Sequence, residues 1–169
     1  MNEQELAALI KQAQTGDTDG FAQLYKAVYR PVYKIARIAM KSEDAAVEAV
    51  RLTVLDSFAA LPTATLSTTA QFIEWLVKIL CTKIRHINKS CGGLTEKTDG
   101  GSEIRQALDE LPDIERLVLS VSTVCGCSAE KTAKLCGYTE ETVGVCLTNA
   151  EVTMKTRLLS GQSLSLIHI

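Results

Sequence analysis

The stretch SAEKTAKLCGYTEETVGVCLTNAEVTMKTR, residues 128–157, decides the fold of this chain. Ala133, Gly137 and Val143 stand four and six residues apart, a spacing typical of two helices joined by a tight turn. The small alanine lets the helices cross closely, and the glycine tolerates the left-handed backbone that ends the first helix. Thr139 is suited to cap the second helix, and Val143 is expected to face the core. The stretch therefore predicts a helix-turn-helix.

The bulk composition indicates a soluble globular protein. Of the 169 residues, 22% are charged and 46% hydrophobic, and the net charge is -2 with a pI near 5.7. No segment approaches the roughly 20 apolar residues of a membrane span, and the N-terminus lacks a secretory signal pattern. We expect a cytoplasmic protein without a membrane segment, whose six cysteines are reduced thiols.

Apolar residues recur every three or four positions along most of the chain, which predicts helices. The expected helices cover residues 5–15, 17–39, 44–61, 70–88, 103–111 and 113–123, followed by the helix-turn-helix. No strand pattern and no internal repeat is found. The glycine-rich run NKSCGGLTEKTDGGS predicts a flexible linker. We predict an all-α chain with a helical domain at 1–88, a linker at 89–102, and a helix-turn-helix domain at 103–160.

The last nine residues, 161–169, are predicted to be a tail outside the second domain. Their ending, LSLIHI, has no amphipathic period and resembles a translated sequencing-adapter scar.

Four further segments extend the pattern beyond the helix-turn-helix, which itself contains LCGYTEETV. They are GDTDGFAQLYKAVYRPVYKIA, VLDSFAALP and QFIEWLVKIL in the first half, and ALDELPDIERLVLSV in the second. In their order and spacing, with the linker between them, they resemble the extracytoplasmic-function (ECF) sigma factors of bacterial RNA polymerase. The likeness covers most of the chain.

The resemblance implies a non-enzymatic transcription initiation factor that needs no cofactor. Its first domain would bind core RNA polymerase and the promoter −10 region, and its second would read the −35 element. An anti-sigma factor is a further partner that the resemblance allows. Glu48 and Arg51 take the polymerase-binding positions, although the family commonly has Gln at the second. The DNA-binding candidates are Lys78, Lys83, Arg85, Lys89, Thr139, Thr142, Lys155 and Arg157.

The recognition helix departs from the family pattern. Its groove-facing side is expected to carry Gly144, Cys146, Thr148, Asn149 and Glu151, where the family has lysine and arginine. Residues 103–157 hold six basic and nine acidic side chains, a net charge of -3. Because neutralisation of phosphates supplies most non-specific DNA affinity, weaker DNA binding is expected. The alternative function is therefore a degenerate sigma scaffold that binds protein partners with little or no DNA binding.

Other candidate sites have simpler structural interpretations. Cys125, Cys127, Cys136 and Cys146 are interpreted as structural cysteines, because Cys127 and Cys136 fall at positions where the helix-turn-helix needs small buried hydrophobic residues; the alternative is a zinc or redox site. Phe72 and Trp75 are expected in the core rather than stacked on bases, and the basic group after Trp75 is equally explained as a solvated face. No catalytic or metal-binding constellation is found.

Overall fold

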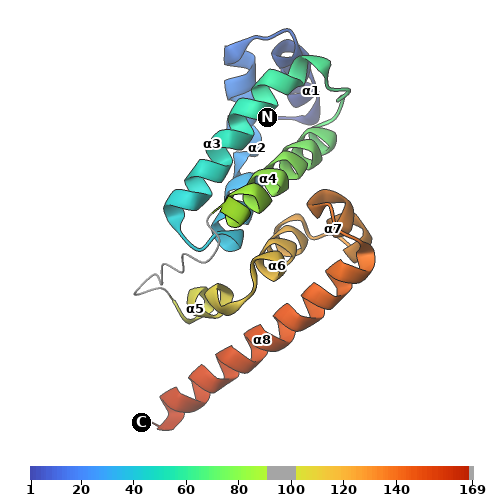
Figure 1. Cartoon of the computed structure of the whole chain (residues 1–169). Helices are drawn as coiled ribbons and strands as arrows, with labels where there is room; N and C mark the ends of the chain where they lie inside the picture. The colour runs from blue at the N-terminus through green and yellow to red at the C-terminus, as the bar shows by residue number, and fades with distance from the viewer. Residues whose placement is uncertain (91–101, 168–169) are drawn as a thin grey trace.

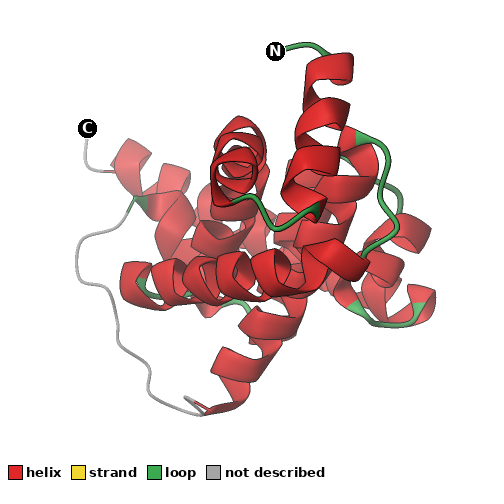
Figure 2. Cartoon of the chain, turned by 90° about the horizontal axis from the view of Figure 1, so that it is seen from above, coloured by secondary structure: helices red, strands yellow, loops and turns green. Residues whose placement is uncertain are grey.

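The computed structural model describes residues 1–90 and 102–167, with side chains up to residue 160. Within these residues every regular element is helical, as Figure 2 shows, and this confirms the all-α prediction. No described helix is both long and apolar enough to cross a lipid bilayer. Most of the predicted linker, residues 91–101, lies outside the described residues.

The first half, residues 1–90, consists of four helices. Helix α1 (Glu3–Gln14) begins at a capping box made by Asn2 and Glu5, and α2 (Thr18–Ala39) is capped by Asp17. Helix α2 continues through Pro31 and buries one apolar face along its whole length. This stripe, which α1, α3 and α4 cover, contains Phe21, Leu24, Val28, Val32 and Ile35.

Helices α3 and α4 lie side by side along this core (Figure 1). Helix α3 (Glu43–Ala60) is capped by Ser42 and leads into a short 3-10 turn, η1 (Leu61–Thr63). Thr68 then accepts a hydrogen bond from the amide of Gln71 at 3.2 Å, which caps α4 (Thr69–Ser90). Helix α4 ends two residues beyond the predicted boundary at 88. It buries Phe72, Leu76, Leu80 and Ile84.

The second half begins at Ser102, which caps α5 (Glu103–Glu110). Helices α6 (Asp113–Cys125) and α7 (Ala129–Cys136) follow, and each ends at a glycine in the left-handed conformation. These are Gly126, with φ of +58°, and Gly137, with φ of +78°. The last helix, α8 (Glu140–Ile167), extends past residue 160, so the backbone of residues 161–167 of the predicted tail continues it.

The two halves share one hydrophobic core. Leu117, Val118 and Val121 of α6 join the same buried cluster as the apolar residues of α2 and α4. Helix α6 packs on α2, while α7 packs on α4. The second half therefore lies directly against the first (Figure 1).

Arg116 of α6 is buried where these halves meet, with a side chain that is 1% exposed. Its Nε donates a hydrogen bond to the carbonyl oxygen of Ala39, at the end of α2, at 3.1 Å. Its two terminal nitrogens donate to the carbonyl oxygen of Leu111 and to the carboxylate of Asp113. A buried charge is tolerated only when its donors are satisfied, so this arginine fixes α6 to the end of α2.

Replacing Arg116 with alanine is expected to lower the free energy of unfolding by about 2–4 kcal/mol, because buried carbonyl oxygens lose their donor. Chemical denaturation followed by circular dichroism measures the change. Arg30→Ala is the matched control, because Arg30 is exposed on α2 and should change stability by about 0.5 kcal/mol or less. Equal losses in the two variants would contradict the role of the buried guanidinium.

Candidate nucleic-acid interface

One exposed face of α4 carries three of the four basic DNA-binding candidates of the first half. Lys78, Thr82, Arg85 and Lys89 recur at intervals of four, three and four residues, and all four are exposed. This spacing places them on one side of the helix. Lys78 and Lys89 form no ion pair within the described residues, so their ammonium groups are available to phosphates.

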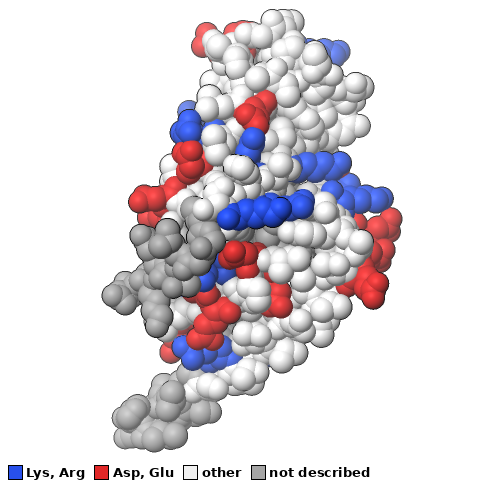
Figure 3. Space-filling model, viewed as in Figure 1, with Lys and Arg blue, Asp and Glu red and all other residues white. Residues whose placement is uncertain are grey.

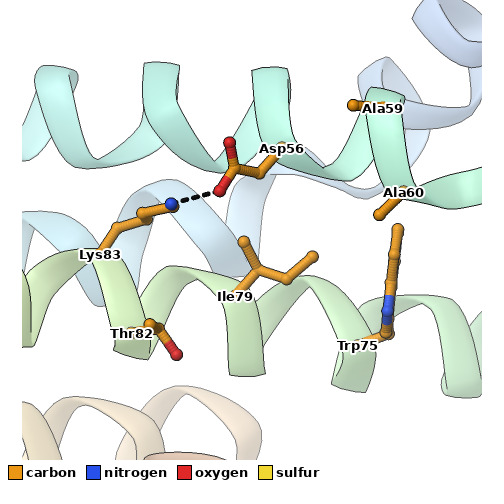
Figure 4. Close-up of a pocket in the computed structure, with 7 residues that line it drawn as sticks. All are labelled: Asp56, Ala59, Ala60, Trp75, Ile79, Thr82 and Lys83. Atoms are coloured by element: carbon orange, nitrogen blue, oxygen red, sulfur yellow. Dashed lines mark ion pairs between the residues drawn. The ribbon is translucent and has the colours of Figure 1, made fainter.

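Lys83 lies on another side of α4, beside a groove between α3 and α4. The groove has a volume of about 510 Å³. In Figure 4, Trp75, Ile79 and Lys83 point from α4 toward α3, and Lys83 forms an ion pair with Asp56. The residues that line it are Asp56, Ala59, Ala60, Trp75, Ile79, Thr82 and Lys83. An indole and an aliphatic chain beside a cation provide a surface for a base and its phosphate.

The sequence analysis did not predict this groove. Phe72 is fully buried, as expected, but Trp75 is only partly buried and forms part of the groove wall. The spacing of Trp75, Ile79 and Lys83 at four-residue intervals indicates a shared face. The small Ala59 and Ala60 opposite them, which leave the space open, belong to a distant segment.

Arg85 is already engaged by the second half. Its Nη1 donates a hydrogen bond to the carbonyl oxygen of Cys136 at 3.3 Å, and its guanidinium carbon lies 4.8 Å from the ring centre of Tyr138. Both partners belong to the helix-turn-helix, at the end of α7 and in the turn that follows. The sequence predicts that Arg85 contacts DNA, but in this structure its guanidinium contacts the helix-turn-helix.

Thr139 and Thr142 stabilise the start of α8. The hydroxyl of Thr139 accepts a hydrogen bond from the amide of Thr142 at 3.1 Å, and the two hydroxyl oxygens are 2.8 Å apart. Val143 is fully buried, as its position in the motif predicted. The first turn of α8 exposes Glu140 and Glu141, so it presents carboxylates to solvent.

The exposed side of α8 has little free positive charge. Lys155 pairs with Glu151 at 2.7 Å, and Arg157 pairs with Glu110 of α5 at 3.1 Å. Cys146 is buried, so its expected place on the groove-facing side was wrong. Figure 3 shows a mostly uncharged surface along α8. Among the described side chains of this helix, the large apolar ones that are exposed are Val145, Val152 and Leu159.

Glu48 and Arg51 pair with each other on the outer side of α3. Arg51 donates two hydrogen bonds to the Glu48 carboxylate, at 2.7 and 2.8 Å. These hydrogen bonds lower the pKa of Glu48 below its usual value. Val47 and Leu55 of the same helix are 50% and 54% exposed. The pair therefore lies among exposed apolar side chains.

The cysteines of the described residues behave as structural thiols. Cys81, Cys136 and Cys146 are buried, and all five described cysteines are free. No group of three or more potential metal ligands occurs among the described residues. A hydrogen bond with the Cys136 thiol, together with burial, raises the pKa of Cys81 well above its usual value. Burial, with the neighbouring Cys127 and Cys136, raises the pKa of Cys125 to about 11.

The comparisons with known proteins identify the family. Residues 3–136 match the family model described as ECF sigma factor, and this segment spans α1 to α7. The chain belongs to the ECF sigma factor family. Members of this family act in transcription initiation as regulatory factors. A search of curated protein sequences finds no match.

Two solved structures, of CnrH and of the sigma factor RpoE, have a similar fold. CnrH, solved in complex with the cytosolic domain of CnrY, has a TM-score of 0.63 and 20% identity, and the match covers 92% of this chain and 98% of CnrH. RpoE, solved with the anti-sigma factor NepR from Bartonella quintana, has a TM-score of 0.64 and 18% identity, with 82% and 96% covered. At this identity the likeness shows the shared fold.

The raised pKa of Cys125 predicts slow alkylation. At pH 8 the thiolate fraction should be about 100-fold below that of a cysteine with the ordinary pKa of 9.0, since the pKa is near 11. The rate should therefore increase as the pH rises toward 11. Iodoacetamide labelling read by mass spectrometry measures it, with the denatured chain as control. Equal rates in the folded and denatured chains would contradict the assignment.

Proposed function

We propose that this protein binds core RNA polymerase through α3 and directs promoter recognition in transcription initiation, in the cytoplasm. The observation that carries the proposal is the family match over residues 3–136, which includes both the α3 and α4 surfaces. The exposed side chains of these two helices support different roles, with α3 binding protein and α4 binding DNA.

The outer side of α3 is suited to bind a protein. Val47, Leu55 and the paired side chains of Glu48 and Arg51 combine exposed apolar area with a satisfied ion pair. Protein interfaces commonly combine such apolar contacts with a few polar groups that fix orientation. We assign polymerase binding to this surface of α3.

The basic side of α4 and the adjoining groove are suited to bind single-stranded promoter DNA. Lys78 and Lys89 supply positive charge that is unpaired where the structure describes the chain, while Trp75 and Ile79 offer a stacking surface in the groove. Lys83 would reach a phosphate only by leaving Asp56. Arg85 would have to leave Cys136 and Tyr138.

The second candidate function is a protein-interaction module on a sigma scaffold. The observation that favours it is the exposed side of α8, where Val145, Val152 and Leu159 are 55–62% exposed at seven-residue intervals. Lys155 and Arg157, the basic residues proposed for the −35 element, are both ion-paired. An anti-sigma factor is one such partner, since RpoE was solved with one. Steeply salt-dependent affinity for duplex DNA would exclude a module that binds only proteins.

Charge reversal on α3 is expected to weaken polymerase binding. Arg51→Glu places two carboxylates one helical turn apart in the exposed apolar surface, and we expect at least about a tenfold loss of affinity. Binding of the labelled full chain to the core polymerase of its host measures the effect. Lys11→Ala, an exposed change on α1, is the control and should leave the affinity unchanged. Absence of binding by the unaltered chain would contradict the proposed function.

Removal of Lys78 is expected to weaken DNA binding uniformly across sequences. With the chain bound to core polymerase, the slope of log affinity against log salt should become shallower by about 0.7 for a short single strand of mixed sequence. Fluorescence anisotropy at several salt concentrations measures it for Lys78→Ala. Lys11→Ala again serves as the control. An unchanged slope would remove Lys78 from the interface.

A further inference from the structure

The carbonyl groups at the end of α2 are capped by arginines of the second half. Arg105 of α5 donates hydrogen bonds to the carbonyl oxygens of Arg37 and Met40, and Arg116 of α6 donates to that of Ala39. The last carbonyls of a helix have no partner within the helix and carry its partial negative charge. Two arginines of the second half therefore supply the hydrogen-bond donors for the carbonyl groups at the end of α2.

Arg105 is held in place for this contact. Its guanidinium also pairs with Asp109, one turn along α5, at 2.9 Å. The two side chains are 17% and 22% exposed, compared with 1% for Arg116. Arg105 is thus the accessible member of the pair, at the outer edge of the contact, whereas Arg116 also supports the fold of its own half through Leu111 and Asp113.

A second contact joins the halves between α4 and α7. The buried side chains of Cys81 and Cys136 belong to one core cluster, Arg85 donates a hydrogen bond to the carbonyl oxygen of Cys136, and Lys131 pairs with Glu74 at 2.6 Å. A Cβ atom on Gly137 would lie 2.8 Å from Nη1 of Arg85, so the turn of the helix-turn-helix fits closely against α4. This contact brings the basic side of α4 next to the helix-turn-helix, the two parts of the chain that are proposed to bind DNA.

That proximity is incompatible with simultaneous binding to both promoter elements. This step depends on the proposed function, which places α4 at the −10 region and the start of α8 at the −35 element. Elements about 25 base pairs apart are separated by roughly 85 Å along DNA. Arg85 lies 3.3 Å from the carbonyl oxygen of Cys136, four residues before α8 begins. The two halves must therefore separate before both elements are bound.

We propose that Arg105 and Arg116 form a clasp on the end of α2 that holds the protein closed, and that release of Arg105 sets how often it opens. In the closed form the basic side of α4 is partly occupied by the helix-turn-helix. Opening breaks the contacts of Arg85 and exposes Cys81 and Cys136 together. The clasp is thus a built-in restraint on promoter binding, separate from any partner protein.

The cysteine thiols provide the test, because some are buried between the two halves and another is buried within the second half alone. Cys81 of α4 and Cys136 of α7 are each 1% exposed and belong to the core cluster that the two halves share. Cys146 is 6% exposed on α8, which packs on α6 and α7 of its own half. Alkylation of Cys81 and Cys136 therefore reports opening, whereas alkylation of Cys146 reports unfolding of the second half.

The experiment compares the full chain with Arg105→Ala by iodoacetamide labelling at one pH, read for each cysteine by mass spectrometry. Loss of two charge-assisted hydrogen bonds should accelerate labelling of Cys81 and Cys136 by about tenfold or more, with little change at Cys146. Lys134→Ala is the control, since Lys134 pairs with Glu130 within α7 and does not join the halves. It should leave all three rates unchanged.

Two results would overturn the clasp. An unchanged Cys81 rate in Arg105→Ala would show that this arginine does not hold the halves together. A parallel increase at Cys81 and Cys146 would show that it stabilises the fold of the second half instead. Because labelling needs neither polymerase nor DNA, a positive result stands even if the chain fails to bind polymerase, which would contradict only the proposed function.

Discussion

The buried guanidinium of Arg116 constrains the whole molecule. A charge with 1% exposure must keep its hydrogen-bond partners, and one of them is the carbonyl oxygen of Ala39 in the other half of the chain. This requirement aligns α6 with the end of α2. Once α6 lies there, Leu117, Val118 and Val121 enter the shared core and α7 reaches α4. The contact between Arg85 and the helix-turn-helix follows from that placement.

The local features of the fold could be predicted from the sequence because they depend on nearby residues. Gly137 ends α7 in a left-handed conformation and Val143 is buried, both as their positions predicted. Helical periodicity identifies the side of a helix that is buried, but it does not identify what covers that side. The packing of α6 on α2 therefore could not be predicted, and residues 91–101, which connect the halves, lie outside the described structure.

The candidate site was predictable only in part, for the same reason. Lys78 and Lys89 are exposed and unpaired among the described residues, in agreement with a role in binding phosphates. The pairing of Lys155 with Glu151 follows from a four-residue spacing that the sequence displays. The partners of Lys83, Arg85 and Arg157 come from distant segments, so the sequence alone indicated only their charge. Non-local contacts decide which of these cations are free.

The position of Trp75 has a spectroscopic consequence. It is the single tryptophan of the chain, and its partly buried indole lines the groove between α3 and α4. The ultraviolet emission of the protein therefore originates mainly from one wall of that groove. A base that stacks there would quench this emission, while a ligand bound elsewhere would leave the indole in the same surroundings. The chain thus carries its own fluorescent reporter at the candidate interface.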